Sequence, residues 1–554
     1  MPDPAAAHPA PARPSATLVV VRDGPGGIEV LLMRRAERGD RNSGAWVFPG
    51  GLVDAADRVA HRVCAGLDDA AASRRLGLPE GGLDFVVAAV RECFEESGLL
   101  FALDADGHEA DAASPAIAAW RPQLHRGGRG LHELCAAAGL RIAADRLFYL
   151  SHWLTPLAYP KRFDTRFFIA RAPQAQAAHA DGDEVTEHRW MRAADALAAE
   201  PPLKLLTPTR STLERIGGFA DVAALLAWAA APRDMALVMP RAGVGRDGSR
   251  PVLPGEPAWA ELGRIDPQGH GHGSYDINPD MPVPLSPRVI RVTANNGSVM
   301  TGPGTNTYLL RGDAGWTVID PGPADEAHVD AILAAAPGPI VRILATHTHV
   351  DHSPACALLA ARTGAPVAGR IAAYPDRQDT GFAPDAVLAD GERLVLGGDC
   401  TLRVIQTPGH ASNHLCFLLE EEKTLFTGDH VMQLSTVVIN PPDGDMAAYL
   451  VSLRRLLDED LEWLAPGHGF LMAEPKRAIE AIVAHRLKRE AKVVDVLRSL
   501  GPASAQTLLG AVYADVPERL HPVALRSLTA HLLKLRDEGR AGEAGGRWAV
   551  AAPR

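Results

Sequence analysis

The stretch that most constrains the fold is THTHVDH, residues 346–352, which directly follows the apolar segment IVRILA. An apolar run of this kind predicts a buried strand, so the loop after it places His347, His349, Asp351 and His352 at a strand end. Three more residues follow strand-like stretches and adjoin a glycine: His410, Asp429 and His468. Core histidines placed by chance do not give seven ordered positions. The pattern predicts an α/β domain whose strands deliver these side chains to one sheet edge.

Imidazole and carboxylate together suit zinc, and seven ligands suffice for two Zn²⁺ ions. We expect one ion to be held by His347, His349 and His410, and the other by Asp351, His352 and His468. Asp429 is expected to bridge them. A water bound to zinc has an apparent pKa of about 7, so this site predicts hydrolysis of a carbonyl or phosphoryl group.

The motif HxHxDH with the downstream His, Asp and His resembles the metallo-β-lactamase fold, which implies an αββα sandwich and names Asp351 as catalytic. Asp429 stands where zinc β-lactamases usually have a cysteine. In having an aspartate at this position, the sequence resembles the glyoxalase II and nuclease branches of the fold. MTGPGTNTYLL, residues 300–310, and the helices that end the chain look most like the lactamase-β-like-2 endoribonuclease group. His414 is expected to be an outer-shell or substrate residue, or an ordinary buried histidine.

A second motif begins at FPGG, residues 48–51, and is completed only at RECFEESG, residues 91–98. Glu92, Glu95 and Glu96 share one helix face, and three carboxylates this close suit a hard cation such as Mg²⁺ or Mn²⁺. These stretches resemble the Nudix box, with an α/β/α sandwich as the implied fold. The residues at positions of the box, besides the three glutamates, are Gly50, Gly51, Asp57, Arg91 and Gly98.

The sequence departs from the usual Nudix box in two places. Asp57 stands where the first glutamate belongs, and Arg58–Val90 replace seven residues. Loop insertions cost little entropy, so the two halves can still meet. Split boxes of this kind are found in the peroxisomal coenzyme A diphosphatase subgroup, which implies metal-assisted diphosphate hydrolysis with Glu96 as a catalytic residue. Glu184 or Glu187 is expected to supply an additional carboxylate.

Length and composition set the domain organisation. With 554 residues, the chain is expected to hold about three domains of ~100–200 residues. We predict a disordered lead at 1–15, a Nudix domain at 16–235 and a Pro/Gly-rich linker or wrapping segment at 236–276. A metallo-β-lactamase domain at 277–474 and a winged helix at 475–554 follow. Six scattered cysteines and the absence of a long apolar run predict a cytoplasmic protein without a membrane span. The abundance of alanine, and of arginine over lysine, is typical of a GC-rich bacterial genome.

The C-terminal segment has its own charge balance. Residues 476–554 contain 14 Lys or Arg against 8 Asp or Glu, whereas the whole chain has a net charge of -11. The basic segment indicates either a nucleic-acid grip or a docking module with a solvated face. The acidic whole argues against a general nucleic-acid binder.

Three functions remain open from the sequence. The first is a bifunctional hydrolase of small molecules, with a thioester or related ester at the zinc half and a CoA-like or nucleotide diphosphate at the Nudix half. The second is an RNA-processing protein that cuts single-stranded RNA with zinc and uses the Nudix half as a nucleotide-binding domain or scaffold. In the third, the altered spacing leaves the Nudix half as a binding module. Neither the substrates nor the oligomeric state follow from the sequence.

Overall fold

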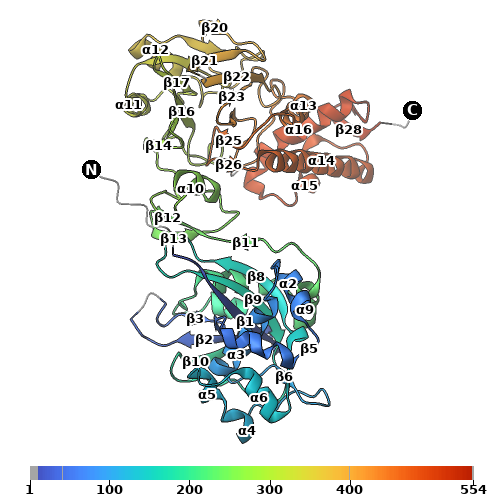
Figure 1. Cartoon of the computed structure of the whole chain (residues 1–554). Helices are drawn as coiled ribbons and strands as arrows, with labels where there is room; N and C mark the ends of the chain where they lie inside the picture. The colour runs from blue at the N-terminus through green and yellow to red at the C-terminus, as the bar shows by residue number, and fades with distance from the viewer. Residues whose placement is uncertain (1–9, 40–41, 399, 434, 552–554) are drawn as a thin grey trace. The chain divides into compact units, whose positions relative to one another are not determined.

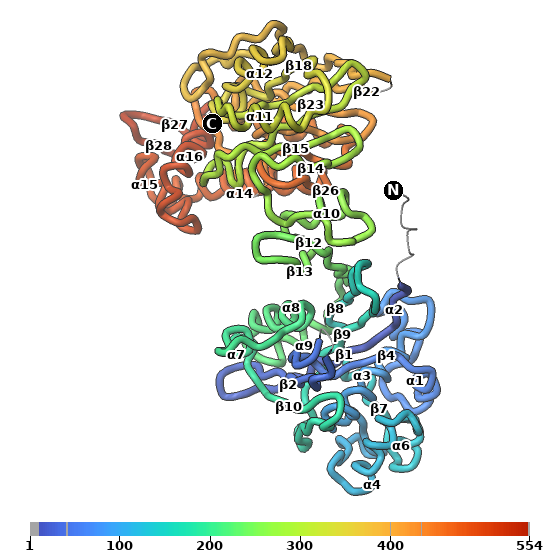
Figure 2. The backbone as a smooth tube through the Cα atoms, turned by 90° about the vertical axis from the view of Figure 1, so that its left-hand side faces the viewer, coloured from blue at the N-terminus to red at the C-terminus, as the bar shows by residue number. Residues whose placement is uncertain are grey.

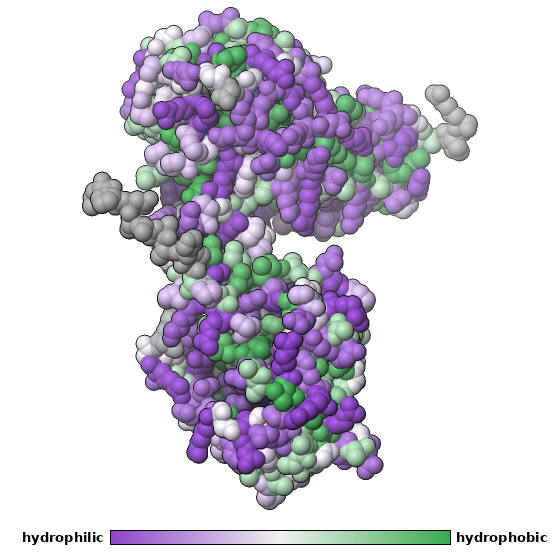
Figure 3. Space-filling view, viewed as in Figure 1, coloured by the Kyte–Doolittle hydropathy of each residue, from purple (hydrophilic) through white to green (hydrophobic). Residues whose placement is uncertain are grey.

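The computed structural model describes residues 10–39, 42–398, 400–433 and 435–551. Two compact units are present: Met1–Arg241 with Gln268–His270, and Ala242–Pro267 with Gly271–Arg554. Most of the expected lead at 1–15 lies outside the described residues, and the first strand already begins at Arg13. Among the described residues, no helix combines the length and the apolar character that a membrane span requires. Hydrophilic residues predominate on the face of each unit that Figure 3 shows.

The first unit is built on a mixed sheet with the strand order β10-β2-β1-β9-β8-β11 (Figure 1). Strands β1 and β2 form a hairpin around a glycine turn, with Gly24 opposite Gly27, and β1 runs parallel to β9. Short strands β3 (Trp46–Val47) and β4 (Gly50–Leu52) pair with β2 and β1. The long strands are β1 (Arg13–Gly24), β2 (Gly27–Arg35), β8 (Phe148–Leu154), β9 (Phe163–Arg171) and β10 (Val185–Arg192), with β11 (Leu237–Val238) at the edge.

Helices cover both faces of this sheet. Helix α3 (Gly82–Ser97) packs against β1, β4 and β9, and its buried residues join the core under Leu18 and Val20. Helix α9 (Val222–Ala230) packs against β1, β8 and β9, and α8 (Thr207–Ile216) precedes it. The predicted α/β/α arrangement of a Nudix domain is therefore confirmed.

The insertion that splits the Nudix motif folds into regular structure. Helix α1 (Ala55–Val59) leads into it, and it contains the 3-10 turn Ala60–Val63, β5 (Cys64–Ala65) and α2 (Asp69–Leu76). Strand β5 joins β7 (Arg141–Ala143) and β6 (Ala102–Leu103) in a small sheet. The inserted residues thus pack beside α3 and leave its glutamates on the same helix.

The second unit has two sheets packed face to face, with apolar side chains such as Tyr308, Leu310, Phe417 and Phe426 between them. Helices α11 (Glu326–Ala335) and α12 (Ala355–Thr363) pack on the first sheet, and α13 (Met446–Leu456) packs on the second (Figures 1 and 2). This is the predicted αββα sandwich. The first sheet comprises β14 (Val283–Pro284), β15 (Val289–Thr293), β16 (Asn306–Arg311), β17 (Trp316–Ile319), β18 (Ile340–Leu344), β19 (Val367–Gly369) and β20 (Ala386–Val387). The second comprises β21 (Arg393–Gly397), β22 (Cys400–Gln406), β23 (Leu415–Leu419), β24 (Thr424–Gly428), β25 (Trp463–Pro466) and β26 (Met472–Ala473).

The stretch expected as a linker or wrapping segment carries secondary structure. It forms a hairpin, β12 (Arg241–Gly245) with β13 (Gly248–Val252), and helix α10 (Trp259–Ile265). From α10, Glu261 accepts two hydrogen bonds from Arg291 on β15, at 2.6 and 2.9 Å, and both side chains are buried. Because a buried charge needs a partner, this ion pair ties the segment to the sandwich.

The chain ends in the predicted winged helix. Its three helices are α14 (Pro475–Leu500), α15 (Ala505–Val512) and α16 (His521–Asp537), followed by the hairpin β27 (Ala541–Ala544) and β28 (Arg547–Val550). These elements share their own apolar core and gather into one module in both views (Figures 1 and 2). The N-terminal part of α14 also joins the core around α13, so the module is packed on the sandwich.

Candidate metal centres

The loop after β18 brings three imidazoles together. Nδ1 of His349 lies 2.9 Å from Nε2 of His347 and 2.9 Å from Nε2 of His410, which comes from the loop after β22. One nitrogen of each ring therefore points to a common centre, and the three nitrogens lie within 4.8 Å of one another. Three convergent imidazole nitrogens form a ligand set that zinc favours.

A second group lies beside the first. Oδ2 of Asp351 is 3.4 Å from Nε2 of His468 and 3.5 Å from Nε2 of His352. Oδ1 of Asp429 is 3.2 Å from His468 and 3.4 Å from His352, and its Oδ2 is 3.6 Å from Nε2 of His410. The structure therefore brings together all seven residues singled out in the sequence, with Asp429 between the two groups.

Buried atoms without hydrogen bonds show that this cluster fits a metal. Within the described part of the chain, Nε2 of His352 and Oδ1 of Asp429 are buried and have no hydrogen-bond partner. Buried polar atoms are almost always satisfied, so two that face each other at 3.4 Å call for a ligand between them. Mixed imidazole and carboxylate donors match zinc or a related divalent metal.

Hydrogen bonds behind the cluster fix the direction of each ring. Nδ1 of His352 lies 2.8 Å from Oδ2 of Asp320, Nδ1 of His410 lies 2.8 Å from the Val438 carbonyl, and Nδ1 of His468 lies 3.0 Å from the Gly304 carbonyl. Since carbonyl and carboxylate oxygens accept, each ring donates from Nδ1 and presents the lone pair of Nε2. The sequence analysis missed Asp320, although it follows the apolar strand β17 in the same way that the ligands follow theirs.

His414 lies outside the ligand group. Its Nδ1 is 2.9 Å from Oγ1 of Thr407, and its Nε2 accepts from the backbone N–H of Asp429 at 3.2 Å. The ring is fully buried and stacks on His347, with centroids 5.0 Å apart. His414 is thus placed to hold the backbone of Asp429.

The two groups differ in their electrostatics. Burial, together with the charge of the neighbouring His410, lowers the pKa of His349 to about 3. Burial also acts to lower the pKa of His468, but the carboxylates of Asp429 and Asp351 outweigh it and raise this pKa to about 9. The first group therefore consists of neutral imidazoles, the form that binds metal, whereas the second balances imidazole against carboxylate.

The metal cluster opens into a cavity of about 960 Å³. His349, Asp351, His410 and Asp429 line one end of it. The winged helix supplies much of the remaining wall, with side chains from α14, α16 and the segment between α15 and α16. These are His485, Arg486, Arg489, Tyr513, Asp515, Val516, Pro517, Leu520, Val523, Ala524, Arg526 and Ser527.

In the first unit, the split Nudix motif is reassembled around Arg91. Nε and Nη2 of Arg91 donate to Asp57 at 2.8 and 3.1 Å, and Nη1 donates to Glu92 at 2.8 Å. Glu95 is 3.4 Å from Nη1 as well. Burial alone would lower the pKa of Arg91, but Asp57 and the glutamates outweigh it and raise the pKa. Asp57 therefore serves as the partner of Arg91.

The two glycines of the motif make room for the glutamates. The backbone N–H of Gly50 donates to Oε2 of Glu96 at 3.1 Å. A Cβ on Gly51 would lie 2.4 Å from a carboxylate oxygen of Glu92. At the helix end, Gly98 adopts a φ of 76°, which a glycine tolerates without strain. Gly51 thus leaves space for the carboxylate of Glu92, whereas a Cβ on Gly50 would meet the backbone of β1 at Ala16.

Burial changes the pKa values of the glutamates in the Nudix motif. Burial raises the pKa of Glu95 to about 7, even though Arg91 opposes the shift. Burial and the charge of Glu92 raise the pKa of Glu96 well above its usual range. Glu184 adds negative charge to this surrounding, whereas Glu187 forms an exposed ion pair with Arg189 at 2.6 Å. A divalent cation would stabilise such a group in its ionised form.

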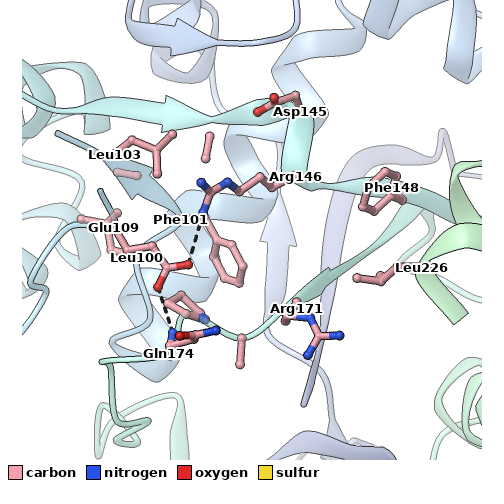
Figure 4. A pocket seen from close by; sticks show the side chains of 14 residues that line it. Leu100, Phe101, Leu103, Glu109, Asp145, Arg146, Phe148, Arg171, Gln174 and Leu226 are labelled. Atoms are coloured by element: carbon pink, nitrogen blue, oxygen red, sulfur yellow. Dashed lines mark hydrogen bonds and ion pairs between the residues drawn. The ribbon is translucent and has the colours of Figure 1, made fainter. Parts of the chain in front are cut away.

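Another cavity of the first unit, of about 250 Å³, lies away from this motif (Figure 4). Glu109 accepts from Arg146 at 3.2 Å and from the backbone N–H of Gln174 at 2.8 Å. None of the Nudix glutamates lines this cavity, and the carboxylate of Glu109 already has two hydrogen-bond donors. This cavity is not the catalytic candidate.

Several basic side chains of the winged helix are paired within the module. Arg489 and Lys492 bind Asp515, and Lys534 and Arg540 bind Glu490. Such pairing reduces the positive charge that a nucleic acid would meet.

Comparison with known proteins agrees with this architecture. The family model of the metallo-beta-lactamase superfamily matches residues 300–468, and that of the beta-lactamase associated winged helix domain matches residues 504–548. The NUDIX domain model matches residues 12–111, and the NUDT19 Nudix domain model matches residues 67–200. All three predicted domain types are therefore present.

Individual relatives match each half. A beta-lactamase-like protein 2 homolog of Drosophila melanogaster is 32% identical over 269 residues, which cover 46% of this chain and 90% of that protein. An atrochrysone carboxyl ACP thioesterase of Aspergillus chevalieri is 31% identical over 45% of this chain and 80% of its own. A solved NUDIX hydrolase from Alicyclobacillus acidocaldarius is 30% identical, covers 39% of this chain and 96% of its own, and has a TM-score of 0.34. The chain is thus a hydrolase that joins a NUDT19-type Nudix domain to a C-terminal half belonging to the metallo-beta-lactamase superfamily, among the relatives of beta-lactamase-like protein 2.

Proposed function

We propose that the metallo-beta-lactamase site hydrolyses a thioester or a related ester with two Zn²⁺ ions. The observation that carries this proposal is the setting of the ligand cluster at one end of a large cavity with an apolar wall. Val299, Met300 and Val350 line this cavity, and all three are exposed. Exposed apolar side chains around a ligand site suit an acyl group. The name of the Aspergillus relative, a thioesterase, supports the same reaction.

The proposed ligand sets follow the geometry of the cluster. His347, His349 and His410 would hold one ion, Asp351, His352 and His468 the other, and Asp429 would contact both. When bound there, zinc supplies an activated water and polarises the scissile carbonyl. The chain's own contribution is orientation, because Asp320 and the carbonyls of Val438 and Gly304 fix the rings of His352, His410 and His468.

We infer a second activity, diphosphate hydrolysis, for the Nudix domain. Glu92, Glu95 and Glu96 would hold Mg²⁺ or Mn²⁺, which neutralises charge on a diphosphate when bound. Arg91, held by Asp57, keeps the glutamates converged despite the insertion. Because the two halves of the motif meet in the fold, an active enzyme is favoured over a binding module. The presence of a proposed thioester hydrolase in the same chain supports a CoA-like substrate for the Nudix domain.

One experiment tests both activities. Purified protein is incubated with a panel of acyl-CoA thioesters, Zn²⁺ and Mg²⁺, and the products are identified by mass. We expect Asp351→Ala to abolish thiol release and Glu96→Gln to abolish 3′,5′-ADP release, each without affecting the other product. The exposed Asp460 and Glu80 offer matched controls, Asp460→Asn and Glu80→Gln.

The outcomes separate the hypotheses. Thiol release that persists in Asp351→Ala would refute the zinc-site assignment. If wild-type protein forms neither product, the thioester proposal fails for these compounds. Cleavage of single-stranded RNA that requires Asp351 would then support the RNA-processing alternative.

A further inference from the structure

The cavity in front of the metal cluster is rich in positive side chains. Its lining includes four arginines and one histidine other than the metal ligands: Arg377, His485, Arg486, Arg489 and Arg526. Apart from the ligands Asp351 and Asp429, Asp515 is the one acidic residue that lines it within the described part of the chain. A cavity with this balance attracts an anion.

Two of the four arginines are already engaged. Arg486 donates to the carbonyl of Val437, and it lies over the ring of Tyr449. Arg489 makes a bidentate pair with Asp515, at 2.8 and 2.9 Å, and stacks on Tyr513. Both guanidinium groups therefore serve the structure of the cavity wall.

The other two arginines remain available and lie near each other. Arg526, half-buried on α16, makes no hydrogen bond or ion pair with any residue that the structure describes. Among the residues that the structure describes, the one ion pair of Arg377 is with its exposed neighbour Asp376, at 3.8 Å. Burial lowers the pKa of Arg526, and the charge of Arg377 lowers it further while Asp376 opposes. The exposed carboxylate of Asp376 offsets these two like charges only in part, so the pair favours a bound anion.

The backbone presents Arg377 from a fixed position beside the metal loop. Its φ is 62°, in the left-handed region that non-glycine residues rarely adopt. The next residue, Gln378, accepts from Thr348 at 2.8 Å and donates to Asp443 at 3.0 Å. Because Thr348 lies between two metal ligands, Arg377 is tied to the same loop. Strain of this kind is often found at ligand-binding residues.

We propose that Arg377 and Arg526 form a phosphate-binding pair, which selects thioesters whose thiol portion carries a phosphate group. This proposal rests on the thioester hydrolysis inferred for the metal site and names its substrate class. Guanidinium groups bind phosphate through paired, charge-assisted hydrogen bonds. With the phosphate at this pair and the acyl group along Val299, Met300 and Val350, the thioester carbonyl is directed to the metal cluster. The winged helix thereby supplies one half of the recognition site.

Steady-state kinetics with three substrates of one acyl chain test the pair: acyl-CoA, the same acyl group on a phosphopantetheinyl carrier protein, and acyl-N-acetylcysteamine, which lacks phosphate. Arg526→Gln and Arg377→Gln are each expected to lower kcat/KM for acyl-CoA about tenfold, mostly through KM. The same variants should leave acyl-N-acetylcysteamine unchanged. Arg519→Gln is the matched control, since Arg519 is an exposed arginine of the winged helix outside the cavity lining. A higher kcat/KM for the carrier protein or for acyl-CoA identifies the natural source of the phosphate.

A binding measurement keeps this test independent of the reaction. Calorimetry uses desulfo-coenzyme A, which has no thioester to hydrolyse, without Mg²⁺ and in a Glu96→Gln background, so that the Nudix domain does not cleave its diphosphate. We expect about tenfold weaker binding when Arg526→Gln or Arg377→Gln is added to this background than for the background alone or with Arg519→Gln. If no thioester is hydrolysed but this loss is seen, the proposed function fails and the phosphate site stands. Equal losses on the phosphate-free substrate, or unchanged binding of desulfo-coenzyme A, would overturn the proposal. Tighter binding of single-stranded RNA that the same variants abolish would overturn it too.

Discussion

The two metal-type sites of this chain bury several ionisable side chains at one point, but they balance charge differently. Around α3, three carboxylates, those of Asp57, Glu92 and Glu95, converge on an internal cation, Arg91. In the sandwich, the carboxylates Asp351 and Asp429 contact imidazoles, and Thr305 also donates to Asp351 at 3.5 Å. Buried atoms of His352 and Asp429 have no hydrogen-bond partner among the described residues. The first site is therefore held together by the chain itself. The second depends on the hydrogen bonds behind it and on its metal.

Removal of the internal cation should have the largest effect on stability. Arg91→Gln leaves the carboxylate of Asp57, which is 1% exposed, without its charged partner. Breaking a buried ion pair costs about 3–5 kcal/mol, so we expect the free energy of unfolding of the first unit to fall by that amount. Hydrogen exchange of α3 amides in increasing urea measures it.

A surface pair offers the control for that variant. Arg58 contacts Glu80 at 3.1 Å with both side chains mostly exposed, and Arg58→Gln should change stability by less than about 1 kcal/mol. If Arg91→Gln proves as mild as Arg58→Gln, the carboxylates of the Nudix motif are not held by their arginine, and the contrast between the two sites disappears.

An intermediate effect, on zinc affinity, is expected from a change to Asp320, which forms hydrogen bonds with His352 and with Thr346 of the metal-binding loop. Asp320 accepts from His352, from the hydroxyl of Thr346 at 2.7 Å and from its backbone N–H at 2.7 Å. In Asp320→Asn the amide cannot accept at both positions. Loss of such a partner typically lowers metal affinity or activity 10–100-fold. Zinc affinity, measured by competition with a chelator, should fall by that factor.

We expect Asp320→Asn to leave the fold intact, so that a lower zinc affinity can be distinguished from a general loss of structure. The circular dichroism spectrum of Asp320→Asn should match that of the wild type, and Asp460→Asn, at an exposed carboxylate, should keep the wild-type zinc affinity. Unchanged zinc affinity in Asp320→Asn would mean that the second site does not depend on its supporting hydrogen bonds.

The same contrast explains what the sequence could predict. The ligands of the sandwich stand in one short loop and after successive strands, so the pattern HxHxDH alone indicated the cluster. The Nudix residues Asp57 and Arg91 are 34 positions apart, and only the fold shows that they form one ion pair. Asp320 offered a weak signal, a carboxylate after an apolar strand. Arg526 offered none, because its place in the cavity depends on how the winged helix packs against a loop about 150 residues earlier.

The smallest predicted effects distinguish two neighbouring histidines of the second site. His414 accepts from the backbone N–H of Asp429 and pairs with Thr407, whereas both ring nitrogens of His430 are buried without a hydrogen-bond partner in the described residues. His430 packs its ring against Tyr449, with centroids 5.0 Å apart. An apolar ring should therefore replace His430 without loss, but not His414.

Urea unfolding and zinc affinity of His414→Phe and His430→Phe measure this difference. His414→Phe leaves the N–H of Asp429 unsatisfied, so we expect a loss of about 1–3 kcal/mol in stability together with weaker zinc binding. His430→Phe removes two unsatisfied nitrogens and should leave stability unchanged or raise it by up to about 1 kcal/mol, with normal zinc affinity. Equal losses in both variants would show that ring packing, rather than the hydrogen bond to Asp429, maintains this side of the metal cluster. In that case the dependence of the second site on its supporting hydrogen bonds would be limited to Asp320 and the carbonyl acceptors.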